Sequence, residues 1–345
     1  MAAESPIERD PESGLDEERL AQFIRHELPE ADAISISDVT LASGGLSRDN
    51  FLFDLRWSQG STQHEWPLVL IRDGDRPGQT DRGGEFRLLQ ALEPTAIPAP
   101  RAYWCDMSGS WLERPFVVME RVGGAVTPPF QVPYAESPVQ RQKLTERFVD
   151  ILCDLHLLDW RALGIDFLET PVCATDELAA AAAKLFRATV QMTEVLEPSP
   201  TLERGMDWCV GNAPRTRRWT LCHGDYKPDN ILHADGEILA VIDWERARIS
   251  DPMADLGYVC APHLQVGSLA SGLAEQESIL RRYEARTGFE VEPEAIRFWQ
   301  VHWLLLTCFY FGLRTADAAS RGQDAGPMDK LLMDHLLKLI EQALA

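Results

Sequence analysis

The chain has 345 residues, of which 45% are hydrophobic and 25% charged, and this composition excludes a disordered chain and a collagen-like repeat. Its 33 basic and 54 acidic side chains give a formal net charge of -21, which excludes binding to nucleic acid or anionic membranes through bulk electrostatic attraction. The length predicts one large or two medium-sized domains.

The sequence lacks the patterns expected of a secreted, membrane-spanning or disulfide-bonded protein. The N-terminal segment has no basic region followed by an apolar run, so we expect no secretory signal. The longest apolar stretch, Trp303–Leu313, is too short to span a bilayer and predicts a buried helix. The cysteines are scattered and form no C-x-x-C pair, which indicates reduced thiols. We therefore expect a cytoplasmic protein without membrane or nucleic-acid partners, whose oligomeric state the sequence does not indicate.

The first third of the chain predicts a small sheet-based lobe. Residues 1–14 are rich in Pro, Ser and acidic side chains, which is typical of a mobile tail. Apolar residues at helical spacing predict a helix over Leu15–Leu28, and a second helix is predicted over Glu85–Leu92. The predicted strands are Ile34–Ala42, Phe51–Trp57, Leu68–Ile71, Arg101–Cys105 and Phe116–Met119. Residues 15–120 are thus expected to form an N-terminal lobe built on an antiparallel sheet.

The pattern changes after this lobe. Residues 121–128 contain paired glycines and a proline and are predicted to be a hinge. Helical patterns dominate residues 129–345, at Gln140–Leu158, Thr175–Leu196, Leu269–Thr287, Pro293–Ala318 and Met328–Leu344. A short strand-rich segment, Thr220–Ile249, interrupts them. The sequence therefore predicts an α+β protein with a small antiparallel-sheet N-lobe and a larger helical C-lobe.

A β-hairpin is predicted inside the strand-rich segment. Two short apolar runs flank a turn at residues 234–236. Asp225 and Asn230 precede the first arm and Asp243 follows the second, so we expect these side chains to converge. Two carboxylates and an amide, with Lys227 nearby, suit Mg²⁺ held against a phosphate chain, because magnesium prefers oxygen ligands.

The run His223-Gly-Asp-Tyr-Lys-Pro-Asp-Asn230 resembles the H-x-D-x-x-x-x-N catalytic loop shared by protein kinases and the aminoglycoside phosphotransferase-like small-molecule kinases. The resemblance implies a bilobal protein kinase-like fold and an ATP- and Mg²⁺-dependent kinase. It implies that Asp225 is the catalytic aspartate and that Lys227 neutralises the transferring phosphoryl group. Asn230 and Asp243 are implied to hold magnesium.

Three further residues have implied supporting roles. His223 is expected to pack under the loop and steady it. The resemblance implies that Asp255 braces the loop through backbone amides. We interpret His156 as a packing residue rather than a ligand.

The N-terminal lobe contains the residues expected to bind ATP. Ser43, Gly44 and Gly45 lie between two predicted strands, where glycine lets backbone amides approach phosphates. The strand ending at Arg72 resembles the family strand that usually ends in a phosphate-binding lysine. This lobe has no lysine, so Arg72 is expected to take that role, which a guanidinium can perform by clamping two phosphate oxygens.

Three other residues complete the expected nucleotide site. Glu85, on the following helix, is predicted to hold Arg72 in place. Met119 and Glu120 lead into the hinge, where backbone groups are expected to hydrogen-bond an adenine.

The acceptor is expected to be a hydroxyl of a small molecule. A protein kinase is disfavoured because the chain between Asp243 and Asp255 is too short for an activation segment. The helical insert Trp160–Arg218 is what small-molecule kinases of this family use to build an acceptor pocket.

The substrate class stays open between two branches of the family. The segment Val241–Leu256 resembles the hydroxyacyl-CoA kinases allied with acyl-CoA dehydrogenases, which favours a hydroxyacyl-CoA-type metabolite. The acidic composition favours cationic acceptors, as in an aminoglycoside or macrolide antibiotic kinase. A nucleotide-binding pseudokinase without turnover is a further alternative, which the replacement of lysine by Arg72 keeps open.

Overall fold

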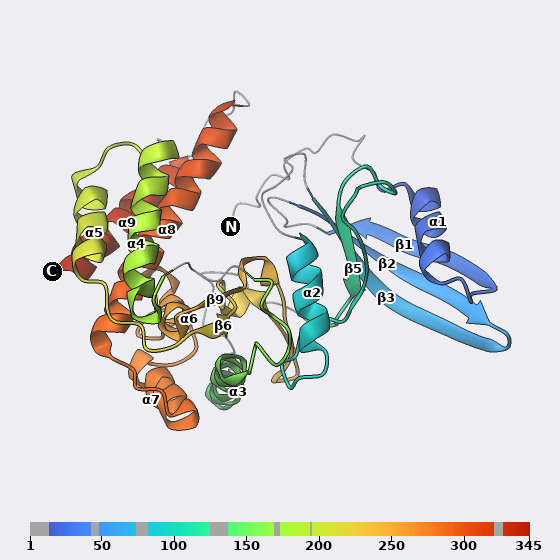
Figure 1. Cartoon of the computed structure of the whole chain (residues 1–345), viewed down its shortest axis with the longest axis horizontal. Coiled ribbons are helices and arrows are strands. Elements are labelled where there is room, and N and C mark those ends of the chain that lie inside the picture. Colours follow the sequence, from blue (N-terminus) through green and yellow to red (C-terminus); the bar gives the residue numbers. More distant parts are fainter. Residues whose placement is uncertain are drawn as a thin grey trace. The chain divides into compact units, whose positions relative to one another are not determined.

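The computed structural model describes residues 14–42, 48–73, 82–124, 137–168, 173–193, 195–320 and 327–345. The chain divides into two compact units, Met1–Glu93 with Pro100–Val122, and Pro94–Ala99 with Gly123–Ala345 (Figure 1). The expected tail at 1–14 lies outside the described residues except for Gly14, and so does the expected hinge beyond Gly124. The predicted lobe boundaries at 120 and 129 therefore stay a prediction.

The described residues of the first unit form an antiparallel sheet of five strands in the order β1-β2-β3-β5-β4. The strands are β1 (Ala33–Leu41), β2 (Arg48–Gln59), β3 (Thr62–Asp73), β4 (Ala102–Asp106) and β5 (Phe116–Glu120). Each coincides with a predicted strand. β2 and β3 are longer than predicted because they form one hairpin that closes at Gly60, whose φ of 58° suits a tight turn.

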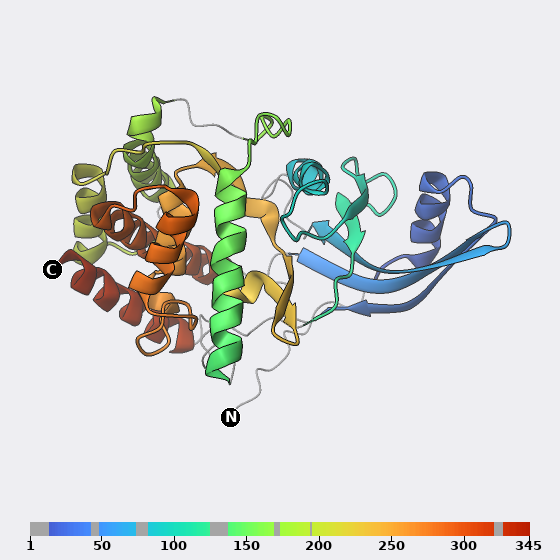
Figure 2. The same cartoon turned by 90° about the horizontal axis from the view of Figure 1, so that it is seen from below.

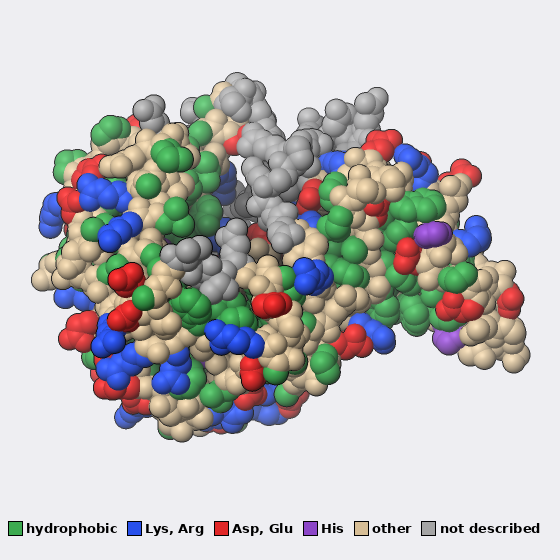
Figure 3. Space-filling model, in the orientation of Figure 1, with side chains coloured by type: hydrophobic (Ala, Val, Ile, Leu, Met, Phe, Trp, Pro, Cys, Tyr) green, Lys and Arg blue, Asp and Glu red, His purple; other side chains and the backbone are tan. Residues whose placement is uncertain are grey.

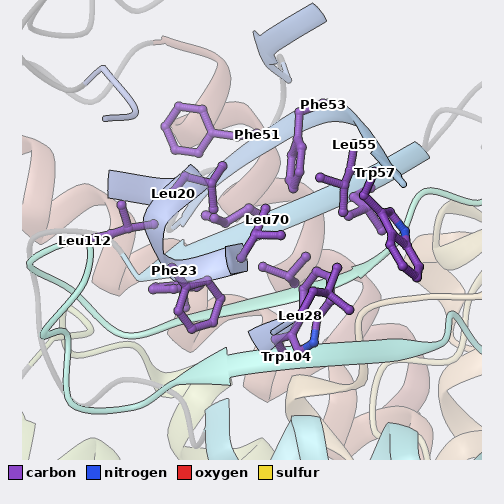
Figure 4. Packing of buried hydrophobic residues seen from close by; sticks show 14 residues of the cluster. Leu20, Phe23, Leu28, Phe51, Phe53, Leu55, Trp57, Leu70, Trp104 and Leu112 are labelled. Carbon is purple, nitrogen blue, oxygen red and sulfur yellow. The ribbon is translucent and has the colours of Figure 1, made fainter. Parts of the chain in front are cut away.

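The core of this unit lies between the sheet and α1 (Glu17–Glu27). The helix is capped by Asp16, whose carboxylate accepts a hydrogen bond from the backbone N–H of Arg19 at 3.0 Å. Figure 4 shows Leu20 and Phe23 among the buried side chains of the strands, as the helical spacing predicted. The second helix, α2 (Arg82–Leu92), packs against β4 and β5.

Helices dominate the second unit, as predicted. Its long helices are α3 (Pro138–Leu157), α4 (Leu178–Thr193), α5 (Pro200–Gly211), α6 (Pro252–Val259), α7 (Gln276–Thr287), α8 (Pro293–Ser320) and α9 (Pro327–Leu344). Figures 1 and 2 show α4, α5, α8 and α9 side by side, and α8 contacts the other three. The predicted apolar stretch Trp303–Leu313 lies inside α8, where it is buried at Trp303 and Leu304 but exposed at Tyr310 and Leu313. In the described part of the chain, the helices lack the length and apolarity needed to cross a membrane.

The helix predicted over Leu269–Thr287 is wrong at its start. The structure begins α7 at Gln276, and residues 266–274 form paired turns. Ser271 and Gly272 both have positive φ, at 51° and 67°, which a right-handed helix does not allow. The helices α5 and α6 were not predicted.

The predicted hairpin is confirmed. β7 (Ile231–Ala234) pairs with β8 (Glu237–Val241), and the turn residues Asp235 and Gly236 have φ of 52° and 77°. Positive φ at both turn residues matches the right-handed twist of a two-residue hairpin. A second short pair, β6 (Thr220–Cys222) with β9 (Arg248–Ser250), flanks it.

Surface charge is mixed on the face shown in Figure 3, where acidic and basic side chains are interspersed. The described side chains of this face therefore form no continuous basic stripe of the kind that follows a nucleic-acid backbone.

Candidate active site

The hairpin brings the predicted residues together at its open end. The backbone N–H of Ile242 donates to the carbonyl of Asn230 at 2.9 Å, so Asp243 follows directly beside Asn230. The amide nitrogen of Asn230 donates to the backbone oxygen and to Oδ2 of Asp225, each at 2.9 Å. These bonds fix the orientation of the Asn230 amide and leave its oxygen for a cation. Asp225 and Asn230 are thus hydrogen-bonded to each other, and the backbone that leads to Asp243 pairs with Asn230.

Asp225 has one oxygen in use and one without a partner. Oδ2 accepts from Asn230 and lies 3.2 Å from Nζ of Lys227. Oδ1 is buried and has no hydrogen-bond partner. A buried acceptor without a donor is costly, and such atoms are common at functional sites. Oδ1 can therefore accept a hydrogen bond from a bound molecule.

Lys227 and its neighbours set the charge around Asp225. Burial acts to lower the pKa of Lys227, but the carboxylates of Asp225 and Asp229 outweigh it and raise that pKa. Burial raises the pKa of Asp229, which lies 3.4 Å from Lys227. Burial and the charge of Asp225 hold the pKa of the Tyr258 phenol well above its usual value. At neutral pH the site therefore contains a charged lysine and a neutral phenol.

Asp255 braces the loop from below, as the resemblance implied. Its carboxylate is fully buried and accepts from the backbone N–H groups of His223 at 2.8 Å and Gly224 at 2.9 Å. It also contacts Nε2 of His156 at 3.2 Å. Although burial acts to raise the pKa of Asp255, hydrogen bonds from His156 and Gly224 lower it overall. His223 packs under the loop and contacts the carbonyl of Ile242 through Nε2 at 3.1 Å.

His156 belongs to a buried cluster with Cys222 and Asp255, whose possible ligand atoms lie within 4.8 Å of one another. Each of these groups has a protein partner. Nδ1 of His156 contacts the hydroxyl of Tyr283 at 2.7 Å, and Sγ of Cys222 lies 3.4 Å from the carbonyl of Asp251. We interpret this cluster as hydrogen-bonded packing beneath the loop.

The loop is pressed against the short turn η4 (Trp244–Arg246). A Cβ atom added at Gly224, whose φ is 80°, would lie 2.3 Å from the carbonyl oxygen of Arg246. Asp243, which precedes the turn, is itself left-handed with φ of 68°. Such a conformation costs about 1–2 kcal/mol in a residue other than glycine and is concentrated at functional sites. The backbone on both sides of Asp225 is therefore closely packed.

The nucleotide residues predicted in the first unit are only partly described. Ser43, Gly44 and Gly45 lie outside the described residues. Arg72 is buried on β3, directly opposite Asp49 of β2, and donates to its carboxylate at 3.1 Å. Because strand side chains alternate between faces, Arg72 shares its face with Leu70 and the α1 core.

Glu85 has a partner other than the predicted one. Its carboxylate accepts from Arg82 at 2.7 Å, and Arg82 also donates to Asp73 at 2.6 Å. Asp73 points to the face opposite to that of Arg72, and this alternation explains why Glu85 meets the arginine of its own helix. The predicted pairing of Glu85 with Arg72 is therefore wrong, because Glu85 pairs with Arg82. Phosphate binding by Arg72 stays a prediction.

The strand that leads to the hinge is β5. Met119 is buried and has strand neighbours on both sides, in β3 and β4. The backbone N–H of Glu120 donates to the carbonyl of Arg101 at 2.8 Å and is thus engaged in strand pairing. Adenine binding by these two residues stays a prediction.

Sequence reasoning missed four residues of these networks: Asp49, Arg82, Arg246 and Tyr258. Asp49 had a readable signal, because it continues the alternation of buried Phe51 and Phe53 and so predicts a paired buried carboxylate. Tyr258 had none, because its position beside Asp225 depends on the packing of α6.

Comparison with known proteins assigns the family. A model of the phosphotransferase enzyme family matches residues 38–299. Acyl-CoA dehydrogenase family member 10 of Mus musculus is 30% identical over 178 residues, which are 51% of this chain and 16% of that protein. Acyl-CoA dehydrogenase family member 11 of Rattus norvegicus is 27% identical over 254 residues, which are 72% of this chain and 31% of that protein. The chain thus spans less than a third of the length of these two curated relatives.

Solved structures show the same fold. A Ralstonia eutropha protein classed as an aminoglycoside phosphotransferase has a TM-score of 0.72 at 21% identity, covering 96% of this chain and 97% of that chain. A ternary complex of aminoglycoside phosphotransferase APH(4)-Ia with AMP-PNP and hygromycin B scores 0.62 at 16% identity, covering 94% and 99%. Macrolide 2'-phosphotransferase MphH from Brachybacterium faecium scores 0.60 at 21% identity, covering 92% and 97%.

These likenesses confirm the predicted α+β protein kinase-like fold. The family model extends from β1 of the first unit into α8 of the second and includes the loop around Asp225. The chain therefore belongs to the phosphotransferase enzyme family of small-molecule kinases and is a kinase.

Proposed function

We propose that this kinase transfers the γ-phosphoryl group of ATP to a hydroxyl of a small molecule, with a hydroxyacyl-CoA-type metabolite as the first candidate acceptor. The observation that carries the proposal is the buried, unpartnered Oδ1 of Asp225, whose other oxygen contacts Lys227 and Asn230. A carboxylate held in this way accepts the hydrogen bond of an acceptor hydroxyl and orients its oxygen for attack. In phosphoryl transfer, catalysis consists mainly of positioning and charge stabilisation.

The residues at the hairpin end fit Mg²⁺. The amide oxygen of Asn230 and the carboxylate of Asp243 are hard oxygen donors, and few protein ligands suffice because substrate phosphates and water complete the shell. The ion would neutralise charge on the phosphates of ATP. Lys227 adds a second positive charge on the side of Asp225, where the transferred group is expected.

On the family resemblance, we propose that the nucleotide binds at Ser43, Gly44, Gly45, Arg72, Met119 and Glu120. Support comes from AMP-PNP in the APH(4)-Ia complex, a protein with the same fold. ATP is the first choice of nucleotide on this ground.

The likeness to acyl-CoA dehydrogenase family members 10 and 11 supports the hydroxyacyl-CoA-type acceptor, because both proteins are named for enzymes that act on acyl-CoA. The second candidate is an antibiotic kinase, which hygromycin B in the APH(4)-Ia complex supports. A cationic antibiotic needs acidic surroundings, whereas a CoA ester needs cationic ones.

The test is a screen for ADP release with ATP and Mg²⁺ and with hydroxyacyl-CoA esters, aminoglycosides and macrolides as acceptors. We expect Asp225→Asn to lower kcat by about 10²–10⁴-fold while nucleotide affinity stays close to that of the parent protein. Asp235→Asn is the matched control, because it makes the same change in the hairpin turn, where asparagine also tolerates positive φ.

The screen also decides between a catalyst and a pseudokinase. A pseudokinase would bind ATP, as seen by a thermal shift, and release no ADP with any acceptor. Full turnover by Asp225→Asn with an identified acceptor would show that Asp225 is not the catalytic aspartate.

A further inference from the structure

One half-buried arginine of the second unit belongs to the turn that packs against the loop at Gly224. Arg246 ends η4, three residues after Asp243, and its guanidinium carbon lies 4.1 Å from the centre of the Tyr310 ring. Stacking on an aromatic face orients a guanidinium while leaving its N–H donors at the edge for a ligand. The turn is fixed, because its backbone carbonyl packs against Gly224.

Arg246 differs in its partners from four other shielded arginines. Arg72, Arg82, Arg114 and Arg282 each have a carboxylate at ion-pair distance. In the part of the chain that the structure describes, the guanidinium of Arg246 has the Tyr310 ring and no carboxylate at that distance. A charge that is partly removed from water without an ionic partner is costly, which points to a partner that arrives with a ligand.

The neighbouring charges do not supply that partner. Lys227 lies between Asp225 and Asp229 and is the nearer cation for both carboxylates. Glu245 precedes Arg246 and has contacts of its own. Arg248 donates to the backbone carbonyl of Arg246 at 3.3 Å and adds a second positive charge to the turn.

We propose that Arg246 binds an anionic oxygen group of the acceptor, a carboxylate or a phosphate, while the acceptor hydroxyl lies at Asp225. The inference rests on the proposed function and narrows its substrate class to acceptors that bear a negative charge. A guanidinium presents paired N–H donors that match two oxygens of such a group. The same charge repels polyamine acceptors, which disfavours aminoglycosides.

Two matched pairs of acceptors test this inference and separate the two anions. The first pair compares an ω-hydroxy carboxylate with its primary amide, which lacks the negative charge, over a series of chain lengths. The second pair is the CoA thioesters of the same hydroxy acids and their pantetheine thioesters, which differ in the phosphates of the nucleotide part. Amino alcohols of matched length provide the cationic arm. The measured quantity is kcat/KM for each acceptor, from ADP release by the full chain with ATP and Mg²⁺.

The parent protein is expected to prefer the charged member of one pair by at least about tenfold, the usual scale for a hydrogen bond to a charged group. Arg246→Met should reduce that ratio to about one, and Arg246→Lys should restore part of it, since lysine keeps the charge but not the paired donors. Arg218→Met is the matched control. Arg218 also stacks on an aromatic ring, at 3.7 Å from Phe289, but it is exposed and outside the catalytic loop.

Three outcomes would contradict the inference. A ratio near one for both pairs in the parent protein, or a ratio that Arg246→Met leaves unchanged, removes the anion-binding role while the kinase proposal stands. A preference for amino alcohols reverses the charge that we assign to the acceptor. If magnesium-dependent turnover is missing with every acceptor although ATP binds, the proposed function itself fails.

Discussion

Replacing Gly224 by alanine should damage this protein in two ways that can be separated. Gly224 joins His223 to Asp225 and has φ of 80°, which alanine rarely adopts. The added methyl group would also lie 2.3 Å from the carbonyl oxygen of Arg246 and 2.8 Å from an N–H nitrogen of Arg248. The carbonyl is backbone and belongs to the turn after Asp243, so it has little freedom to move away.

The magnitude follows from these two terms. A left-handed alanine costs about 1–2 kcal/mol, and overpacking a closely packed site costs about 1–3 kcal/mol more. Gly236→Ala isolates the first term, because Gly236 has φ of 77° and its nearest atom to an added Cβ is a flexible carbon of Gln140 at 3.9 Å. We therefore expect Gly224→Ala to lower the free energy of unfolding by about 2–5 kcal/mol and Gly236→Ala by about 1–2 kcal/mol.

Urea unfolding followed by tryptophan fluorescence measures both values under the same conditions. Steady-state ADP release with an identified acceptor measures the effect on the site. A displacement of about 1 Å near the reacting groups costs about 10²-fold, so kcat should fall by that order in Gly224→Ala. Equal unfolding free energies for the two variants would refute the steric contact. Normal kcat in a destabilised Gly224→Ala would refute the coupling between this contact and catalysis.

Two further predictions concern buried charges. Arg82→Met should destabilise the protein by about 3–5 kcal/mol in urea unfolding, because it leaves the buried carboxylate of Glu85 and the half-buried one of Asp73 without this cation. Arg56→Met, at an exposed pair with Glu65, should cost less than about 1 kcal/mol, and similar costs for the two variants would contradict the role of burial. Burial, aided by the charge of Arg248, lowers the pKa of His302 from 6.5 to about 4. Between these pH values the unfolded chain binds a proton that the folded chain does not, so the free energy of unfolding falls as pH drops from about 6.5 to 4. His302→Phe should remove about 3 kcal/mol of that fall, and an unchanged pH dependence between these limits would show that His302 does not titrate as stated.

Much of the fold could be predicted because local sequence patterns reflect local geometry. The alternation of Phe51 and Phe53 predicted β2, and helical spacing of Leu20 and Phe23 predicted α1. The failures have physical causes as well. Residues 269–275 carry apolar side chains at helical spacing, but positive φ at Ser271 and Gly272 turns the chain instead.

The sequence by itself determined the hairpin next to the loop of Asp225 and Asn230. The spacing from Asp225 to Asn230, and the turn at Asp235-Gly236 that brings Asp243 beside them, are local in the chain. A hairpin brings the residues before its first strand close to those after its second, whatever surrounds it.

Only the tertiary structure decided which charged groups pair. Asp49 with Arg72 and Arg82 with Asp73 depend on strand register and on the face to which each side chain points, which differ between adjacent residues. Likewise, Arg246 of η4 and Tyr310 of α8 are far apart in the sequence, so the sequence alone does not predict that their side chains stack. Burial then sets the strength of these charges, because the same groups interact weakly in water and strongly where water is excluded.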